Sequence, residues 1–173
     1  MNVKDTIAAV NQMQADGVIG RYAIGGAVGA TFYLEPAATL DVDIFVTFRP
    51  EAEKLLASPQ PIFDYLKARG ATMQGEHIVV AGWPVQFLPA ANSLIEEALV
   101  QAIEMDVAGL PASVFTAEHL AAIALQTGRA KDKARLLQFI EAGALDATRF
   151  QAIIARHGLV DRWQQFERQF LMS

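Results

Sequence analysis

The sequence predicts an α+β or α/β fold, in which a mixed sheet of about four or five strands is flanked by helices and followed by a helical C-terminal third. Short runs of β-branched and aromatic residues alternate with amphipathic helical segments over residues 1–115. From residue 116 to the end, apolar residues recur only at helical spacing, which predicts three or four helices. We therefore expect a core of residues 1–115 and a helical extension of residues 116–173 packed on it.

The first part of the chain should contain two helices and two strands. Apolar residues at every third or fourth position predict a helix over 3–15. Residues 21–25 are apolar and end in glycine, which predicts the first strand. Small residues open the next segment, so a helix over 26–34 should pack closely on the sheet. β-Branched and aromatic residues after a polar start predict a second strand over 42–48.

The rest of the core should add further strands and helices. A helix is expected around 61–69, because apolar residues face inward there and a glycine follows. Two short strands over 77–81 and 83–88 should be joined at a glycine. Ser93 should cap a helix that runs to Ala102. The segment 105–115 has Gly-Leu-Pro in its middle and predicts a small hairpin.

Composition excludes several classes of protein. Hydrophobic residues make up 53% of the chain, yet no apolar run approaches the roughly 18 residues of a membrane-spanning helix. Lys4 and Asp5 lead into an amphipathic pattern rather than into the apolar core of a signal peptide. Cysteine is absent, which excludes disulfides and cysteine-based zinc sites. We expect no association with membranes and a cytoplasmic location.

Charge is distributed unevenly along the chain. The net charge is −5, which argues against broad, sequence-independent binding to DNA or RNA. Residues 1–115 hold 6 Lys and Arg against 13 Asp and Glu, a net of −7, whereas residues 116–173 hold 8 against 6, a net of +2. The basic run from Arg129 to Arg135 could steer a phosphate-bearing partner, although a solvated helix face is the commoner origin of such a run.

Two acidic residues begin the second predicted strand. Asp41 and Asp43 are two residues apart, so their side chains should emerge on one face, about 7 Å apart along the strand. Paired carboxylates suit Mg²⁺, which takes a few hard oxygen ligands from the protein and keeps the rest of its shell for water and phosphate. Taken alone, however, an Asp-x-Asp pair is more often a solvated strand end.

A glycine turn precedes this strand in the sequence. The first strand runs into Gly25 and Gly26 and then into a helix of small residues, which leaves backbone N–H groups free to meet a phosphate. By itself, a Gly-Gly pair before a helix more often serves close packing. The ordered combination of strand, Gly-Gly, helix, loop and Asp-x-Asp strand is more specific than either motif.

This combination has a counterpart in a known family. The run from Ile24 to Phe48 resembles the signature of the DNA polymerase β-type nucleotidyltransferase fold, most closely the minimal AbiEii-type bacterial enzymes, some of which are toxins of type IV toxin–antitoxin pairs. The segment from Glu118 to Leu120 and that from Gly128 to Arg135 are similar to a Glu-x-Leu … Arg-x-Lys-Asp element in the helical tail of the same family. The resemblance covers most of the chain.

The resemblance implies Mg²⁺-dependent transfer of NMP from an NTP to a hydroxyl of an RNA, a protein or a small molecule, and an antitoxin-type protein partner. Asp41 and Asp43 would hold Mg²⁺ and act in catalysis with Lys131, which would neutralise phosphate charge. Asp132 would orient Lys131 or Arg129, or support the metal site. The residues implied in nucleotide binding are Gly25, Gly26, Arg129, Lys131 and Asp132.

The chain departs from the family pattern at several positions. A third carboxylate is common on a later strand, and the matching position here holds Gln86, which cannot act as a general base. Ala37 and Ala38 stand where an Arg is frequent, Ala124 stands where a Lys is frequent, and Arg135 stands where an Asp is expected. These departures indicate a divergent or reduced site.

Several other residues are weaker candidates for function. Glu76 could replace the missing carboxylate if a hairpin brings it close. His77 and His119 are candidate bases by their chemistry, although structural roles are commoner for lone histidines. Trp83, Phe87 and Trp163 could stack on a base, but core packing is the better expectation for each.

Three functional hypotheses follow. The first is an active nucleotidyltransferase that uses Mg²⁺ and an NTP. The second is a protein of the same fold that has lost catalysis and binds a nucleotide, an RNA or a protein. The third is a dinucleotide-binding module, but the glycine spacing is wrong for it and the acidic pair lies on a polar-alternating strand.

Overall fold

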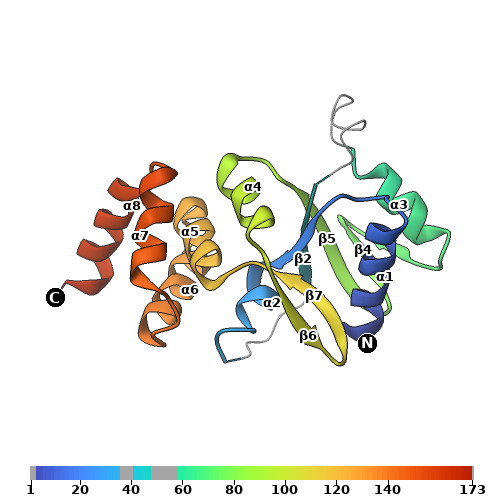
Figure 1. Cartoon of the computed structure of the whole chain (residues 1–173), viewed down its shortest axis with the longest axis horizontal. Coiled ribbons are helices and arrows are strands. Elements are labelled where there is room, and N and C mark those ends of the chain that lie inside the picture. Colours follow the sequence, from blue (N-terminus) through green and yellow to red (C-terminus); the bar gives the residue numbers. More distant parts are fainter. Residues whose placement is uncertain (1–2, 36–40, 48–57, 173) are drawn as a thin grey trace.

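The described part of the chain contains a single mixed sheet. The structure is a computed structural model and describes residues 3–35, 41–47 and 58–172. Seven strands pair in the order β3-β4-β5-β2-β1-β7-β6. Figure 1 labels β2, β4, β5, β6 and β7 of this sheet. β2 runs parallel to β5 and β1 runs parallel to β7, whereas the other neighbours are antiparallel. The strands are β1 Tyr22–Gly25, β2 Val42–Val46, β3 Thr72–Gln74, β4 His77–Val80, β5 Trp83–Pro89, β6 Ile103–Val107 and β7 Leu110–Val114.

The sheet is larger than the four or five strands that the sequence predicts. The strand β3 is the unpredicted one, because all three of its residues are exposed and show no apolar alternation. The hairpin expected over 105–115 is confirmed as β6 and β7, and it joins the sheet where β7 pairs with β1. The strands expected over 21–25, 42–48, 77–81 and 83–88 correspond to β1, β2, β4 and β5. Phe48, at the expected end of the second strand, lies outside the described residues.

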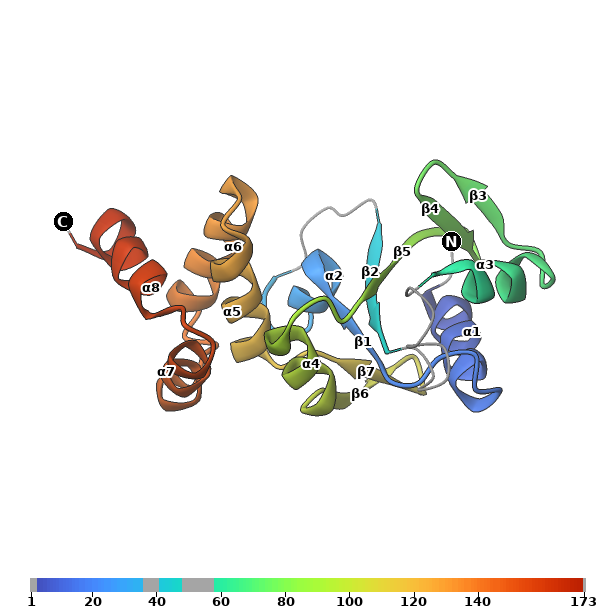
Figure 2. The same cartoon turned by 90° about the horizontal axis from the view of Figure 1, so that it is seen from above.

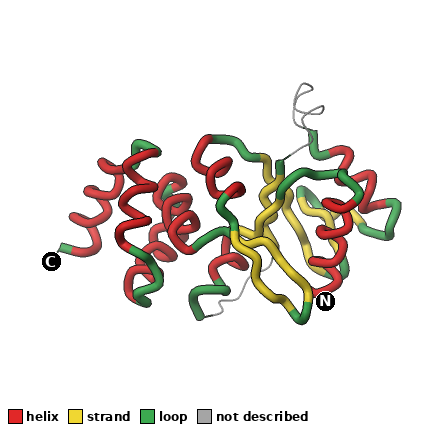
Figure 3. The backbone as a smooth tube through the Cα atoms, in the orientation of Figure 1, coloured by secondary structure: helices red, strands yellow, loops and turns green. Residues whose placement is uncertain are grey.

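The helices are divided between the core and the C-terminal part. α1 and α3 lie at one end of the molecule, and α5 to α8 lie at the other, beyond the sheet (Figures 2 and 3). The predicted helical C-terminal third is therefore confirmed, and a π-helical segment over Glu167–Leu171 continues it. No helix in residues 3–35, 41–47 or 58–172 is both long enough and apolar enough to cross a membrane. The helices are α1 Val3–Ala15, α2 Gly26–Ala30, α3 Gln60–Lys67, α4 Ser93–Val100, α5 Ala117–Thr127, α6 Ala130–Glu141, α7 Ala147–Arg156 and α8 Val160–Phe166.

Two local predictions need correction. The helix expected over 26–34 ends at Ala30, and turns follow in which the Thr31 hydroxyl donates a hydrogen bond to the carbonyl of Val28. The N-cap of α4 is Asn92 rather than Ser93, because the Asn92 side chain accepts a hydrogen bond from the Ile95 backbone N–H.

Two hydrophobic clusters cover the opposite faces of the sheet. Strand β2 shows the division, because its side chains alternate. Ile44 and Val46 belong to the cluster that includes residues of α1 and α3. Phe45 belongs to the other cluster, which includes residues of α4 to α8. Asp43 shares the face of Phe45, so the acidic pair faces the C-terminal helices.

Candidate functional site

Strand register places Asp43 at the centre of the candidate site. Across the antiparallel pair of β1 and β2, Asp43 lies opposite Gly25. Across the parallel pair of β2 and β5, it lies opposite Gln86. Gln86 therefore occupies the position on the neighbouring strand where the family resemblance predicts a third carboxylate. Asp41, two residues earlier, lines the same cavity as Asp43 and Gln86.

The two glycines are required by the packing of the site. Gly26 has a φ of +58°, and a Cβ at this position would collide with the carboxylate of Asp43. A Cβ on Gly25 would lie 2.6 Å from a ring carbon of Phe45. The Gly-Gly pair thus lets the start of α2 approach the acidic strand. Gly26 lines the cavity with Asp43.

Cationic side chains from α6 form the opposite wall of this cavity. The cavity has a volume of about 380 Å³ and lies between the sheet and helices α5 and α6. Arg129, Lys131 and Arg135 all line it, together with Asp132. Gly26, Asp41 and Asp43 therefore share one site with residues of the segment 128–135, which is distant from them in the sequence. Ala124, the expected lysine position, also lines it.

Electrostatics in the cavity are dominated by the acidic pair and the facing cations. Burial raises the pKa of Asp43, and the nearby charge of Asp41 raises it further. The positive charges of Lys131, Arg135 and Arg129 act in the opposite direction but do not cancel the increase. A carboxyl group with a raised pKa beside a second carboxylate indicates a place where an additional cation would be favourable.

Asp132 holds the start of α6 together. Its side chain is buried, and its Oδ2 accepts hydrogen bonds from the backbone N–H of Arg129 at 3.2 Å and from the Arg129 Nε at 2.7 Å. Arg135 Nη1 lies 3.9 Å from Asp132 Oδ1. The ion pairs of a charged helix start are therefore present, and they also fix Arg129 and Arg135 at the cavity. Lys131 has no such restraint among the described residues.

Two residues at the site were not among those that the family resemblance implies in catalysis or nucleotide binding. Arg135 stands where the family pattern has an Asp, so a position that departs from the pattern supplies a third cation. His77, at the start of β4, has its Nε2 2.9 Å from Asp41 Oδ2. Because a carboxylate only accepts hydrogen bonds, Nε2 is the donor. The alternation of β2 gave no signal for this contact, which depends on β4 and β2 flanking β5.

The other candidates lie outside the cavity. Glu76 is exposed in the turn before β4 and does not replace the missing carboxylate. His119 is buried and bonded to Glu97, which is a structural role. Phe87 belongs to the core. Trp83 and Trp163 are partly buried against the two hydrophobic clusters, so core packing accounts for both. Ala37 and Ala38 fall outside the described residues.

The oxygen donors at the cavity fit a hard divalent cation. Asp41 and Asp43 supply carboxylate oxygens and Gln86 can supply an amide oxygen, which is the donor set that Mg²⁺ prefers. Within residues 3–35, 41–47 and 58–172, no three His, Cys, Asp or Glu side chains cluster closely enough to form a complete metal cage. A site of two carboxylates matches Mg²⁺, which keeps much of its shell for water and phosphate.

Comparisons with solved structures identify the fold. The chain is similar to an antigenic nucleotidyltransferase-like protein from Paracoccidioides brasiliensis, with a TM-score of 0.58 and 14% identity over 89% of this chain and 86% of that one. It is also similar to ANT(2″)-Ia in complex with adenylyl-2″-tobramycin, with a TM-score of 0.54 and 13% identity over 93% and 96% of the two chains. The solution structure of ANT(2″)-Ia, an antibiotic-resistance factor, gives a TM-score of 0.52 and 12% identity over 99% and 98%.

Sequence comparisons add no closer relative. No family model matches the chain, and no curated protein matches it. At identities of 12–14%, the structural likeness establishes the fold alone. The predicted nucleotidyltransferase-like fold is thereby confirmed, with a mixed sheet and a helical C-terminal part.

Proposed function

We propose that the protein is a Mg²⁺-dependent nucleotidyltransferase that moves NMP from an NTP to an acceptor hydroxyl. One observation supports this above the others: Asp41 and Asp43 face three cationic side chains of α6 across a single cavity. Carboxylates that suit Mg²⁺ and cations that suit phosphates are the two parts that phosphoryl chemistry needs. The nucleotidyltransferase-like fold of the neighbours agrees with the proposal.

Each part of the cavity has a role in this proposal. Asp41 and Asp43 would hold the metal, which, when bound, neutralises charge on the phosphates during an in-line displacement. Lys131 and Arg129 would bind the triphosphate, and Arg135 joins them as a third cation. Gly25 and Gly26 would allow the backbone to approach the β- and γ-phosphates. Asp132 would position Arg129, to which it is already bonded.

The transfer forms one bond and breaks one. The acceptor oxygen bonds to the α-phosphorus as its hydroxyl proton passes to water, and the bond from that phosphorus to the bridging oxygen of the β-phosphate breaks, which releases pyrophosphate. The cations of α6 would neutralise the charge that grows on the pyrophosphate. Gln86 can hydrogen-bond to the acceptor, but an amide cannot take its proton. The chain therefore lacks the usual base at this position.

We base the proposed acceptor and biological setting on the sequence resemblance. An RNA, a protein or a small molecule would supply the hydroxyl. Kinship with AbiEii-type enzymes would make the protein a toxin-type enzyme with an antitoxin-type protein partner, acting in the cytoplasm. The helical extension over residues 116–173 would complete the nucleotide site built on the core of residues 1–115, since α6 supplies its cations.

A second function is favoured by Gln86. If the missing carboxylate has abolished catalysis, the same cavity would bind a nucleotide, an RNA or a protein without transferring NMP. The register of Gln86 opposite Asp43 is the observation behind this alternative, because it leaves two carboxylates where a third is common.

Isothermal titration calorimetry and label transfer separate the two functions. An active enzyme binds NTP only with Mg²⁺, loses this binding in Asp41→Ala and Asp43→Ala, and transfers label from an α-labelled NTP to an acceptor. Asp64→Ala, an exposed carboxylate of α3, is the matched control and should retain both properties. Mg²⁺-dependent binding without label transfer supports the binding protein. NTP binding that survives both substitutions contradicts the enzymatic function.

A further inference from the structure

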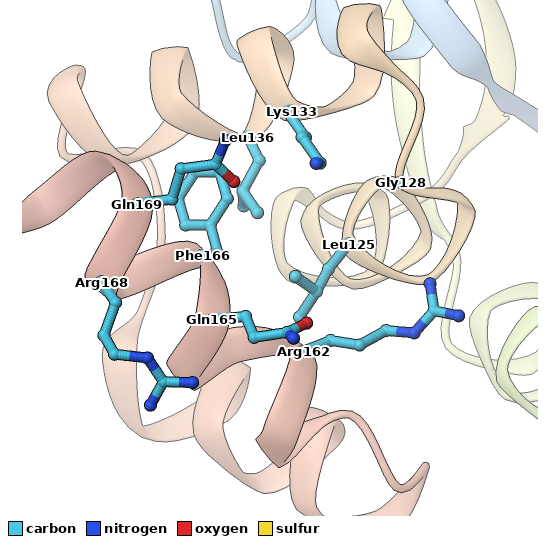
Figure 4. A pocket seen from close by; sticks show the side chains of 9 residues that line it. All are labelled: Leu125, Gly128, Lys133, Leu136, Arg162, Gln165, Phe166, Arg168 and Gln169. Carbon is cyan, nitrogen blue, oxygen red and sulfur yellow. The ribbon is translucent and has the colours of Figure 1, made fainter.

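A second cavity lies in the C-terminal helices, outside the candidate active site. It has a volume of about 720 Å³ and is bordered by α5, α6, α8 and the π-helical segment (Figure 4). Leu125, Leu136 and Phe166 form an apolar wall. Figure 4 shows the Lys133 side chain pointing into the space between these helices, with Gln165 on the facing helix.

The cavity is rich in positive charge that no carboxylate of the described residues pairs with. Lys133, Arg162 and Arg168 line it, and no carboxylate does. Among the described residues, no Asp or Glu lies within ion-pairing distance of these three cations. Arg162 Nη1 donates a hydrogen bond at 2.6 Å to the carbonyl of Gln126, which keeps the guanidinium at the end of α5. Uncompensated cations of this kind favour an anionic ligand.

The beginning of α6 separates this cavity from the candidate active site. Arg129, Lys131 and Arg135 line the active-site cavity, whereas Lys133 and Leu136 line the second one. A helix with its side chains is about 10 Å across, which sets the scale of the distance between cations on its two faces. A ligand with regularly spaced negative charges could therefore contact cations on both sides of α6.

We propose that the second cavity binds backbone phosphates of a single-stranded RNA acceptor whose terminal hydroxyl reaches the active-site cavity. The inference rests on the proposed nucleotidyl transfer and names its acceptor. Cations and side-chain amides suit phosphates and bases, and the apolar wall suits the faces of unpaired bases. The acidic core repels nucleic acid, which confines binding to this part of the molecule.

Fluorescence anisotropy of a labelled RNA of about 12 nucleotides tests the assignment. Lys133→Gln and Arg168→Gln are the chosen variants, since neither side chain makes a hydrogen bond or ion pair within the described structure. Each should weaken RNA binding about threefold to tenfold and lower the slope of log K against log salt by about 0.7 for each phosphate that the variant no longer neutralises. Lys67→Gln on α3 removes an exposed charge far from both cavities and should bind RNA like the unmodified protein.

The same variants separate this inference from the proposed function. Mg²⁺-dependent NTP binding should be unchanged in Lys133→Gln, because Lys133 does not line the active-site cavity. Unchanged RNA affinity in both cavity variants would overturn the inference, and so would a polyglutamate peptide that binds as tightly as RNA with the same dependence on Lys133. RNA binding that depends on Lys133 without any label transfer would contradict the enzymatic function and retain the RNA site.

Discussion

Two carboxylate–histidine contacts lie on the same side of the sheet, and carboxyl groups at these two places, Glu97 and Asp43, have pKa values shifted in opposite directions. Glu97 of α4 is bonded to His119 of α5 at 2.8 Å and to Arg156 of α7 at 2.9 Å. Burial alone would raise the pKa of Glu97, but the hydrogen bonds from its partners hold that pKa at about 2. In the candidate active site, His77 meets Asp41 at 2.9 Å, and the adjacent Asp43 has a raised pKa.

The contrast separates a structural cluster from the one that we propose to be functional. The charge of Glu97 on α4 is matched by His119 of α5 and by Arg156 and His157 at the end of α7, so the cluster fastens α4, α5 and α7 together. Asp41 and Asp43 repel one another, and the cations facing them leave the pKa of Asp43 raised. Glu97 therefore serves stability, whereas the ionised form of Asp43 is held in an unfavourable state that a bound cation would relieve.

Asp43→Asn should produce the largest effect. Removing one of two metal-binding carboxylates should reduce NMP transfer by about 10³-fold, since several kcal/mol of charge stabilisation disappear. The fold should become more stable at neutral pH. The raised pKa of Asp43 in the folded protein means that its effect on stability is most favourable below its ordinary pKa. As pH rises through the folded-state pKa, ionisation of Asp43 lowers the free energy of unfolding, and the uncharged Asn removes this loss. Label transfer and thermal unfolding measure the two effects. A lower Tm in Asp43→Asn would show that Asp43 stabilises the fold as Glu97 does.

Glu97→Gln should show the reverse pattern. The substitution removes a charge from a mostly buried cluster and should lower the free energy of unfolding by roughly 2–3 kcal/mol. Mg²⁺-dependent NTP binding should persist, because Glu97 does not line the active-site cavity. Urea unfolding measures the decrease. The neighbouring Glu96→Gln changes an exposed carboxylate of the same helix and should leave stability nearly unaltered.

The unmodified protein and Glu97→Gln should also differ in how their stability depends on pH. The folded-state pKa of Glu97 is depressed, so its contribution to stability is complete above the ordinary value of 4.5 and disappears as pH falls towards 2. The unmodified protein should therefore lose stability more steeply than Glu97→Gln across this window. Parallel slopes in urea titrations from pH 5 to pH 2 would show that the cluster does not hold the helices together.

Gln86→Glu tests whether the candidate active site lacks a third carboxylate. The change is nearly isosteric and places a third carboxylate beside Asp43. It should strengthen Mg²⁺ binding and, where a missing base limits the reaction, raise NMP transfer by about 10²-fold. Gln74→Glu makes the same chemical change on an exposed edge strand and serves as the control. Weaker Mg²⁺ binding in Gln86→Glu would indicate that the amide itself is the preferred ligand.

Much of the site follows from local patterns in the sequence. The spacing of Asp41 and Asp43 predicts their common face, because side chains alternate along any strand. Gly26 is predictable for a similar reason, since few other residues tolerate its backbone conformation. The segment of Arg129, Lys131 and Asp132 could be placed at the cavity only through the family resemblance, which links two distant parts of the chain.

The remainder depends on how distant elements pack. His77 reaches Asp41 only because β4 and β2 lie on either side of β5. Arg135 faces the cavity because of the rotation of α6 about its own axis, which no local pattern specifies. The strand β3 is absent from the prediction because an exposed edge strand needs no apolar alternation. The cavity around Lys133 likewise exists only once α8 packs beside α5 and α6.

Substitution of His77 should have the smallest effect, and it tests the contact with Asp41 specifically. Its Nε2 donates to one oxygen of Asp41 and would thereby orient the carboxylate that we propose as a metal ligand. His77→Phe removes the donor and should weaken Mn²⁺ binding, measured by electron paramagnetic resonance, by about tenfold. His77→Gln retains an N–H donor and should recover most of that affinity. Equal Mn²⁺ affinities in His77→Phe and His77→Gln would show that the hydrogen bond does not affect metal binding. Other neighbours would then orient Asp41.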